Sequence, residues 1–482
     1  MSATAESRKS GKPATIATAA RTSQRSRAGR PSEGVAKTAR TSISKVSVSP
    51  THGTPPASQF RPVPARSGDH HLIRQLLVTI FHAPSQAEFQ AQLEDPLYEP
   101  TDRLLVRRGS QVIGHSRLVQ REMHFGNQQL AIANVTDVAV LPEYRGQGCG
   151  SELLRAVEDR MVDEQAVIGT LRTRQPAFFL SRGWCIAARH SYSVARASDI
   201  LSFLRESDLS RPDPLRPRIA PLNIRLWRHV EQAALMRLYA ENTAGSYGPL
   251  VRTEPYWRWL VNRRAYDRIY VAIEGPDRLE LDDTIAPIVG YAVMRDTSIV
   301  ELMTSPRHPQ AASQLLARAC RDAIEHDLHH VRLDAPPQHP LHGAFTAARG
   351  SRHFHEADQG EVFLFRLYEP LALLNRLSDE LHLRARQAGL GLPSELGLCV
   401  DGEKHGLMLR PRSAKLASGK LGRSYLECSS IVLAQLLLGH LDIAAAAKAG
   451  RLSVSTRVAM QTAKALFPRL PFWRPPWDDM RA

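Results

Sequence analysis

The chain has 482 residues, of which 43% are hydrophobic and 23% charged. That composition is ordinary for a globular protein, and the length exceeds one compact core, so two to four domains are expected. The formal net charge of +15 is weak evidence for nucleic-acid binding, because it is concentrated at one end. Residues 1–68 hold twelve Lys and Arg against Glu6 and Glu33, which leaves only +5 for the rest.

Neither the apolar runs nor the cysteines point to a membrane or a metal. The longest apolar stretch, residues 431–438, is interrupted by Gln435 and is far shorter than the roughly 20 residues that a membrane span needs. The five cysteines are widely spaced without a C-x-x-C pair, so they predict neither disulfides nor a metal site. We therefore expect a cytoplasmic protein with no membrane span and no metal.

Residues 1–68 are rich in Ser, Thr, Ala, Arg and Pro and poor in aromatic residues, which predicts a disordered basic tail. The pattern changes at residue 69, where a first domain is predicted to run to residue 210. Helical spacing covers residues 71–81 and 151–162, and strand-like runs cover residues 104–106, 111–119 and 130–141.

Three prolines within residues 211–218 predict a linker. The order of helix, strands, helix and closing strand then starts again, so residues 219–369 are predicted to be a second domain similar to the first. It has no counterpart of the glycine-rich turn described next. Residues 370–482 form a third predicted unit, which mixes helices with short strands and ends in a proline-rich aromatic segment.

The most informative motif is the run Arg145-Gly-Gln-Gly-Cys-Gly150, which lies between a predicted strand and a predicted helix. Free N–H groups at a helix N-terminus, together with glycines that let the backbone approach closely, are typical of a pyrophosphate site. A dinucleotide-binding fold would require G-x-G-x-x-G followed by a second strand with an acidic residue, and the spacing here is different.

The segment Val138-Ala-Val-Leu-Pro-Glu-Tyr-Arg-Gly-Gln-Gly-Cys-Gly150 resembles the acetyl-CoA signature of the GNAT superfamily of N-acetyltransferases. The resemblance implies that the backbone of strand residues 138–140 bonds the pantetheine arm of acetyl-CoA and that the following turn holds its pyrophosphate. The implied cosubstrate-binding residues are Val138, Ala139, Val140, Arg145, Gly146, Gln147, Gly148, Cys149, Gly150 and Ser151. Cys149 stands where an aliphatic residue is usual, so its side chain is expected to pack in the core.

A second resemblance covers roughly residues 70–482. Arg252-Thr-Glu-Pro-Tyr-Trp-Arg-Trp-Leu260 and the end of the chain are similar to the enhanced-intracellular-survival (Eis) acetyltransferase family. The resemblance implies an α+β protein of two tandem GNAT domains, each a mixed sheet flanked by helices, followed by a sterol-carrier-like α+β domain. It also implies assembly into a homo-oligomer, with a hexamer as one form, and transfer of acetyl to a small-molecule or peptide amine such as an aminoglycoside, a polyamine or a lysine.

Acetyl transfer needs a neutral amine, a polarised carbonyl and a protonated leaving thiolate. In the resembled family a tyrosine donates the proton and the terminal carboxylate acts as base. Phe179 occupies the tyrosine position here, so Tyr192 or a water donates instead, or the thiolate leaves without help, or the activity is altered. The Ala482 carboxylate is one candidate base, and Asp137, beside the cosubstrate strand, is the other.

Two further hypotheses remain. The Phe179 substitution is compatible with a non-catalytic protein that senses acyl-CoA or carries lipid while keeping the GNAT fold. A protein that binds nucleic acid through its basic tail is a third hypothesis, and binding would then be lost when residues 1–68 are deleted.

Overall fold

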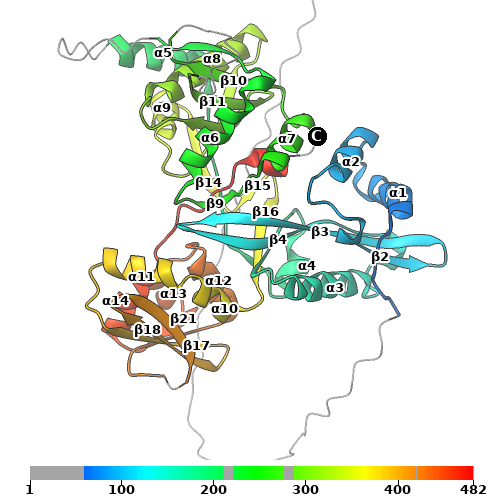
Figure 1. Cartoon of the computed structure of the whole chain (residues 1–482), viewed down its shortest axis with the longest axis vertical. Coiled ribbons are helices and arrows are strands. Elements are labelled where there is room, and N and C mark those ends of the chain that lie inside the picture. Colours follow the sequence, from blue (N-terminus) through cyan, green and yellow to red (C-terminus); the bar gives the residue numbers. More distant parts are fainter. Residues whose placement is uncertain (1–58, 210–220, 276–286, 420, 481–482) are drawn as a thin grey trace, which may run out of the picture. The chain divides into compact units, whose positions relative to one another are not determined.

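The computed structural model describes residues 59–209, 221–275, 287–419 and 421–480 (Figure 1). The described residues all belong to one compact unit, residues 57–482. They form three β-sheets with helices packed against them, so the fold class is α+β, as predicted.

The basic tail predicted for residues 1–68 stays a prediction, and the described part of the chain begins within that range, at residue 59. Residues 1–58 lie outside the described part of the chain, but residues 59–68 belong to the folded part. Phe60 and Ala65 are buried, and β1 (Val63–Pro64) pairs antiparallel with β2 (Arg103–Arg108). The burial of Phe60 and Ala65 was not evident from the composition of this segment, which is rich in Pro and Arg.

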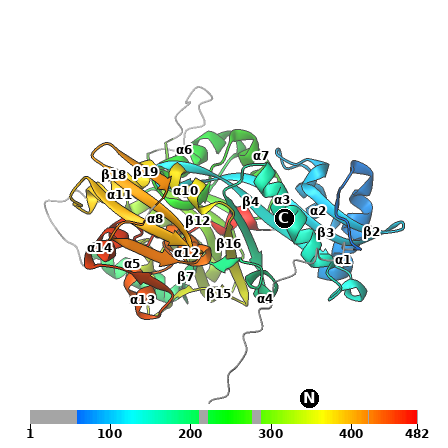
Figure 2. The ribbon, with the colours of Figure 1, turned by 90° about the horizontal axis from the view of Figure 1, so that it is seen from below.

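The first sheet contains nine strands among the described residues, in the order β1-β2-β3-β4-β5-β16-β15, with β6 beside β16 and β9 beside β3. Its central hairpin is formed by two long strands, β3 (Gln111–Phe125) and β4 (Gln128–Val140), and β4 runs parallel to β5 (Ile168–Thr173). Helices α1 (His70–Phe81) and α2 (Gln86–Leu93) lie on one side of this hairpin, and α3 (Cys149–Asp163) and α4 (Pro176–Leu180) lie on the other (Figures 1 and 2).

Helix α3 follows from its apolar spacing. Its buried side chains recur every three or four residues, which places one stripe of the helix against the sheet. Those side chains are Cys149, Leu153, Leu154, Val157 and Met161.

The two sheets that the sequence predicted as separate exchange a strand. β7 (His190–Arg196) comes from the range expected for the first domain but pairs with β13 and β14 of the second sheet. Conversely, β16 (Glu361–Leu367) comes from the second range and pairs with β5 and β6 (Cys185–Ile186) of the first. The domain boundaries 69–210 and 219–369 therefore remain predictions, because the second sheet takes β7 from the first range and the first sheet takes β9, β15 and β16 from the second.

The second sheet has the order β14-β7-β13-β12-β11-β10-β8 among the described residues. It is covered by helices α5 (Ala197–Leu209), α6 (Gln232–Thr243), α8 (Gln310–Glu325) and α9 (Leu341–Ala347). Its remaining strands are β8 (Asn223–Leu226), β10 (Arg268–Ile273), β11 (Ile288–Arg295), β12 (Ser298–Thr304), β13 (His330–Asp334) and β14 (Ser351–His355). Two short strands, β9 (Tyr247–Leu250) and β15 (Ala357–Asp358), extend the first sheet, and α7 (Glu254–Asn262) follows β9.

The third sheet has the order β19-β18-β17-β20-β21. Its strands are β17 (Ser394–Val400), β18 (Glu403–Arg410), β19 (Ser413–Ser418), β20 (Tyr425–Cys428) and β21 (Leu452–Val454). The accompanying helices are α10 (Pro370–Arg376), α11 (Ser378–Gln387), α12 (Ser430–Leu437), α13 (Ile443–Lys448) and α14 (Arg457–Leu466).

The proline-rich C-terminal segment, residues 467–480, has no helix or strand before the short 3-10 helix Pro476–Asp479. It is nevertheless docked, because Phe472, Trp473 and Trp477 are all buried. Trp477 contacts Trp257 edge to face, at 5.7 Å between ring centroids. The aromatic side chains therefore hold in place a segment whose prolines prevent regular structure.

All five cysteines are free thiols and buried. Within the described ranges, no helix has both the length and the apolar character required to cross a membrane. No group of three or more His, Cys, Asp or Glu side chains suited to a metal ion occurs among the same residues.

Candidate active site

The glycine-rich turn lies between the end of β4 and the start of α3, where the sequence predicted it. Gly146 and Gly148 have positive φ angles of 75° and 95°. A Cβ atom at either position would meet nothing within 4 Å, so the outer side of the turn is open. Arg145 ties the turn to the strand, because its Nε donates a hydrogen bond to the Val140 carbonyl at 3.0 Å. This geometry suits an anion that approaches the free N–H groups of the first helical turn.

The predicted residues Cys149 and Ser151 point their side chains to different places, Cys149 into the core and Ser151 toward Arg182. Cys149 is fully buried and packs beside Gly114 and Leu153, and burial raises the pKa of its thiol to about 11. Its side chain therefore belongs to the core, and only its backbone N–H is available to the turn. Ser151 is half-buried and accepts a hydrogen bond at 2.7 Å from Arg182 Nη2.

β4 separates from β5 just before the turn. Their parallel pairing ends at Asn134 with Thr170, although β4 continues to Val140. Val138 and Val140 are half-exposed, whereas Ala139 between them is buried. The backbone of residues 138–140 thus borders a gap between two diverging strands, which is the place where the resemblance expects the pantetheine arm.

Asp137 is the residue at which β4 is distorted. Its φ angle is 53°, and the β3–β4 register shifts here because Arg117 pairs with Thr136 while His115 pairs with Ala139. Such a bulge turns the side chain out of the normal alternation. The Asp137 side chain is 12% exposed and its Oδ2 lies 3.9 Å from Arg103 Nη1.

A cavity of about 280 Å³ opens beside this bulge, and Asp137, Asn134 and Thr136 line it. Its wall also includes residues from α2, β3, β5, α7 and the C-terminal segment. The acidic lining residues are Glu88, Asp95, Asp137, Glu361, Asp478 and Asp479. The basic lining residues are Arg117, Arg121, Arg172, Arg263 and Arg474.

His115 supports the bulge from below. It is completely buried, and its Nδ1 lies 2.8 Å from the Asp137 carbonyl while its Nε2 lies 3.3 Å from Arg103 Nη1. Burial and then the Arg103 charge lower the pKa of His115 to about 3. The imidazole is therefore neutral near pH 7 and donates its Nδ1 proton to the Asp137 carbonyl, which fixes the bulge.

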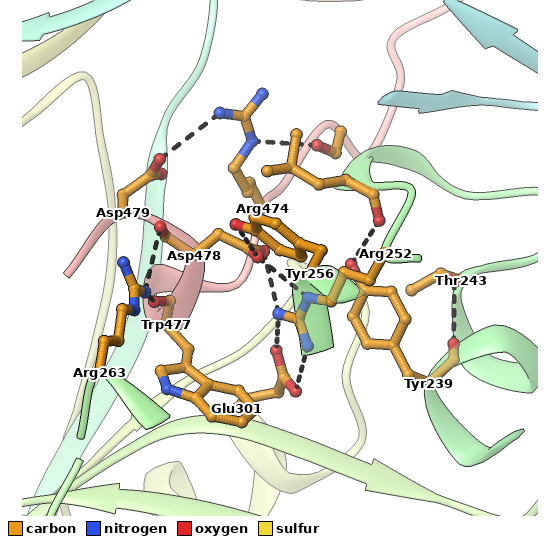
Figure 3. Close-up of polar contacts among 12 residues, drawn as sticks. Tyr239, Thr243, Arg252, Tyr256, Arg263, Glu301, Arg474, Trp477, Asp478 and Asp479 are labelled. Carbon is orange, nitrogen blue, oxygen red and sulfur yellow. Dashed lines mark hydrogen bonds and ion pairs between the residues drawn. The ribbon is translucent and has the colours of Figure 1, made fainter. Parts of the chain in front are cut away.

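The C-terminal segment is attached to the cavity wall by a buried cluster of charges, which Figure 3 shows. Arg252 donates to both carboxylate oxygens of Glu301 and to both of Asp478, and all three side chains are completely buried. Tyr256 donates a further hydrogen bond to Asp478 at 3.2 Å. Asp479 is held by Arg172 at 2.8 Å and by Arg474 at 3.6 Å.

The structure places Phe179 in the core rather than on the cavity wall. It is 7% exposed and contacts Phe178 and Trp184 edge to face. Tyr192, the alternative proton donor, lies in the second sheet, where its hydroxyl donates to Asp358 at 3.1 Å. Tyr256 is the tyrosine that lines the cavity, and burial followed by the charge of Asp478 raises its pKa. Ala482 lies outside the described residues, which end at Met480 on the cavity wall.

Sequence reasoning did not find several residues of this site. Arg182 brings a guanidinium to the N-terminus of α3 and stacks on Phe178 at 4.0 Å. Asp95, just after α2, lines the cavity, and Arg103 of β2 lies behind it, 3.9 Å from Asp137. Both are brought to this place only in the folded chain. The sequence did offer a signal for Arg117 and Arg121. The two arginines are four residues apart in a predicted strand, so they share one face, and charged side chains on a buried face usually have a partner or a function.

The comparisons agree with this geometry. The family model for the acetyltransferase (GNAT) domain matches residues 61–187. A search of curated proteins found no match. Among solved structures, the chain is similar to a GCN5-related N-acetyltransferase from Kribbella flavida, with a TM-score of 0.63 and 19% identity over 86% of this chain and 97% of that one.

Two other solved structures show the same fold. A GCN5-related N-acetyltransferase from Anabaena variabilis aligns with a TM-score of 0.66 and 16% identity, over 86% of this chain and 99% of that one. Eis1 from Mycobacterium abscessus aligns with a TM-score of 0.58 and 16% identity, again over 86% and 99%. At these identities the likeness establishes the fold, while the matched domain gives the enzyme class. The chain therefore contains a GNAT acetyltransferase domain at residues 61–187, and this domain makes the chain an acyltransferase.

Proposed function

We propose that the protein transfers acetyl from acetyl-CoA to an amine by direct attack of the amine on the thioester. The observation that carries this proposal is the divergence of β4 from β5 after Asn134, directly between the open glycine turn and the cavity. A cosubstrate whose pyrophosphate sits on the turn would run along residues 138–140 and present its acetyl group near Asp137. The cavity would then hold the acceptor.

The turn supplies fixed positive potential for the pyrophosphate. The N–H groups from Gly146 to Ser151 and the dipole of α3 favour an anion there, and the Arg182 guanidinium adds a full charge beside Ser151. Strand N–H groups of residues 138–140 that have no partner on the β5 side would polarise the thioester carbonyl. These residues bind and orient the cosubstrate, and none of them needs to form a covalent intermediate.

Asp137 is the proposed general base. As the amine nitrogen forms its bond to the carbonyl carbon, the C–S bond breaks and the amine proton passes to the Asp137 carboxylate. The leaving thiolate has an ordinary pKa near 8.5, so we propose that it takes its proton from solvent. That assignment agrees with Phe179, which cannot donate a proton and is buried away from the cavity.

The Ala482 carboxylate is the competing base, and the two candidates predict different results. Asp137→Asn should lower kcat by 10²- to 10⁴-fold, roughly the contribution of a general base. Asparagine tolerates a positive φ angle, so this change preserves the bulge. Adding one glycine after Ala482 moves the terminal carboxylate and should leave kcat unchanged. The reverse pattern would assign the base to Ala482.

The test is release of CoA thiol from acetyl-CoA by the full chain, with kanamycin, spermidine and a lysine peptide as acceptors and with mass spectrometry of the products. Glu254→Gln, an exposed acidic position on α7, is the matched control for Asp137→Asn. Acceptor-dependent release with an acetylated product supports the proposal. Binding of acetyl-CoA without release for every amine offered, and recovery of release in Phe179→Tyr, would favour the acyl-CoA-sensing alternative.

The sterol-carrier-like character of residues 370–482 and the homo-oligomer, hexameric or otherwise, remain predictions from the Eis resemblance. The mixed sheet and helices α10 to α14 are compatible with such a domain. Size-exclusion chromatography with light scattering would measure the oligomeric state directly.

A further inference from the structure

We propose that the natural acceptor is an amine that also carries a carboxylate, and that Arg117 and Arg121 bind this carboxylate. The inference rests on the proposed acetyltransferase function, because it names the class of acceptor for the same cavity. It is carried by an imbalance of buried charge on the β3 wall.

Arg117 and Arg121 share a single carboxylate. Arg117 and Arg121 each lie two residues from Val119, so the three side chains share one face of β3. All three line the cavity. Each guanidinium is only 7% exposed, and each reaches the same oxygen, Asp95 Oδ2. Arg121 is in short contact with it, whereas Arg117 Nη2 stays 3.4 Å away. Asp95 can therefore neutralise only one of the two.

Arg117 is also incompletely hydrogen-bonded. Its Nε is buried and has no hydrogen-bond partner in the structure, and its contact with Asp95 is the long one. Burial and then the charge of nearby Arg103 lower the pKa of Arg117 to about 10. A buried donor without an acceptor is costly, and a buried cation without its own anion is more so. Such a group is expected to find its anion in a ligand.

Neighbouring groups do not remove the surplus charge. Arg103 is fully buried as well, and Asp137 is its nearest carboxylate, at 3.9 Å. His115 between them is neutral near pH 7 because its pKa is lowered. Three buried guanidinium groups, Arg103, Arg117 and Arg121, thus face two carboxylates, Asp95 and Asp137. When Asp137 accepts the amine proton, the deficit of negative charge becomes larger.

A purely cationic acceptor fits this wall poorly. The carboxylates at the other side of the cavity are already paired, since Asp478 is occupied by Arg252 and Asp479 by Arg172 and Arg474. Glu361 is likewise paired, with Arg172 at 3.7 Å. A polyamine would therefore meet the buried guanidinium groups on β3, and Glu88 is the one lining carboxylate for which the described residues show no ion pair. A carboxylate-bearing amine satisfies both ends, because its amine lies toward Asp137 and its carboxylate toward Arg117 and Arg121. The volume of about 280 Å³ matches a small acceptor of amino-acid size.

The experiment compares amino acids with the amines that result from removing their carboxylate. Lysine with cadaverine, tyrosine with tyramine and arginine with agmatine are offered to the full chain with acetyl-CoA, and kcat/KM is measured by thiol release. We expect the amino acid of a productive pair to exceed its amine by about 10- to 100-fold, as for a charge-assisted hydrogen-bonded pair. Arg117→Gln should remove that preference by raising KM for the amino acid alone.

A graded variant and an unrelated arginine keep the test independent of folding. Arg117→Lys retains the charge without the two-pronged donor, so the preference should fall only in part. Arg258→Gln removes an exposed arginine on α7 and should change nothing. Thermal unfolding of each variant shows whether it is folded.

Each outcome decides the point. Equal kcat/KM for both members of every productive pair would overturn the inference while leaving the acetyltransferase intact. A uniform loss of kcat in Arg117→Gln for acceptors with and without a carboxylate would also overturn it, because the arginine would then serve another anion such as the chain's own terminus. If no amine is turned over, the proposed function fails, and calorimetric binding of the same pairs in the presence of CoA decides whether the carboxylate is recognised.

Discussion

Arg252 and Asp478 lie 226 positions apart in the sequence, yet Arg252 Nη2 contacts Asp478 Oδ2 at 2.9 Å in a completely buried ion pair. Arg252 also holds Glu301 and stacks on Tyr239 with its guanidinium carbon 3.9 Å from the ring centroid. Through Glu301 of β12, the pair therefore joins the C-terminal segment to the second sheet (Figure 3). Asp478 also lines the cavity. The wall formed by Asp478, Asp479 and Met480 depends on this ion pair.

Arg252→Gln should destabilise the protein strongly, because it leaves two buried carboxylates without their cation. Breaking a buried ion pair typically costs about 3–5 kcal/mol. The change in the free energy of unfolding can be measured by urea denaturation, with Arg258→Gln as the exposed control, for which less than about 0.5 kcal/mol is expected. A loss below about 1 kcal/mol for Arg252→Gln would show that the segment is held by its aromatic side chains instead.

Gly148→Ala should weaken CoA binding. Its φ angle of 95° is strained for any residue with a Cβ, which costs on the order of 1–2 kcal/mol and distorts the turn. We expect the Kd for CoA, measured by calorimetry, to rise about tenfold. Gly109→Ala, in the β2–β3 turn at φ 60°, introduces a similar strain away from the site. It should lower the Tm without changing the Kd.

Arg182→Gln should raise the Kd for CoA several-fold and make binding less sensitive to salt, because it removes a cation beside the N-terminus of α3. Arg155 lies on the same helix but is 68% exposed and paired with Glu152, so Arg155→Gln is the matched control. An identical Kd for both variants at low ionic strength would remove Arg182 from the phosphate site.

His115 should make the protein sensitive to acid. The unfolded chain protonates this histidine near its ordinary pKa of 6.5, whereas the folded chain resists protonation down to about 3. Its contribution to stability is therefore complete above pH 6.5 and is lost as the pH falls toward 3, by at most about 1.4 kcal/mol per pH unit. His115→Gln should flatten the profile of unfolding free energy between pH 6.5 and 4.5. His330→Gln, at an exposed position on β13, should leave the slope as it is in the wild type.

The sequence predicted the parts of the fold that depend on local pattern. The glycine turn, the stripe of α3 and the strands around it follow from spacing within about twenty residues, and the structure has them at nearly the predicted positions. The packing role of Cys149 could be predicted for the same reason, since its position continues the apolar stripe that includes Leu153. The Arg252 motif was identified by resemblance, without its physical role.

The rest depends on pairing between distant residues, for which one sequence carries no local signal. Nothing in the run of residues 190–196 distinguishes a strand that closes its own sheet from one that pairs with β13 and β14. The Asp95 carboxylate meets Arg117 and Arg121 across more than twenty positions, so the shared charge appears only after folding. The sequence showed that Phe179 cannot donate a proton, but only the structure showed that its side chain lies in the core.

β7 and β16 each pair in the sheet formed mainly by the other half of the chain. The half with the glycine turn is therefore not expected to fold as a separate domain. The matched domain ends at residue 187, just before β7, which pairs in the second sheet. The second neighbour of β5, after β4, is β16, which begins only at Glu361. A fragment cut in the linker would expose the open edge of β5 and carry an orphaned strand, both of which favour aggregation. We therefore expect that deleting the second half prevents the first from folding stably, because β5 and β7 would both lose strand partners.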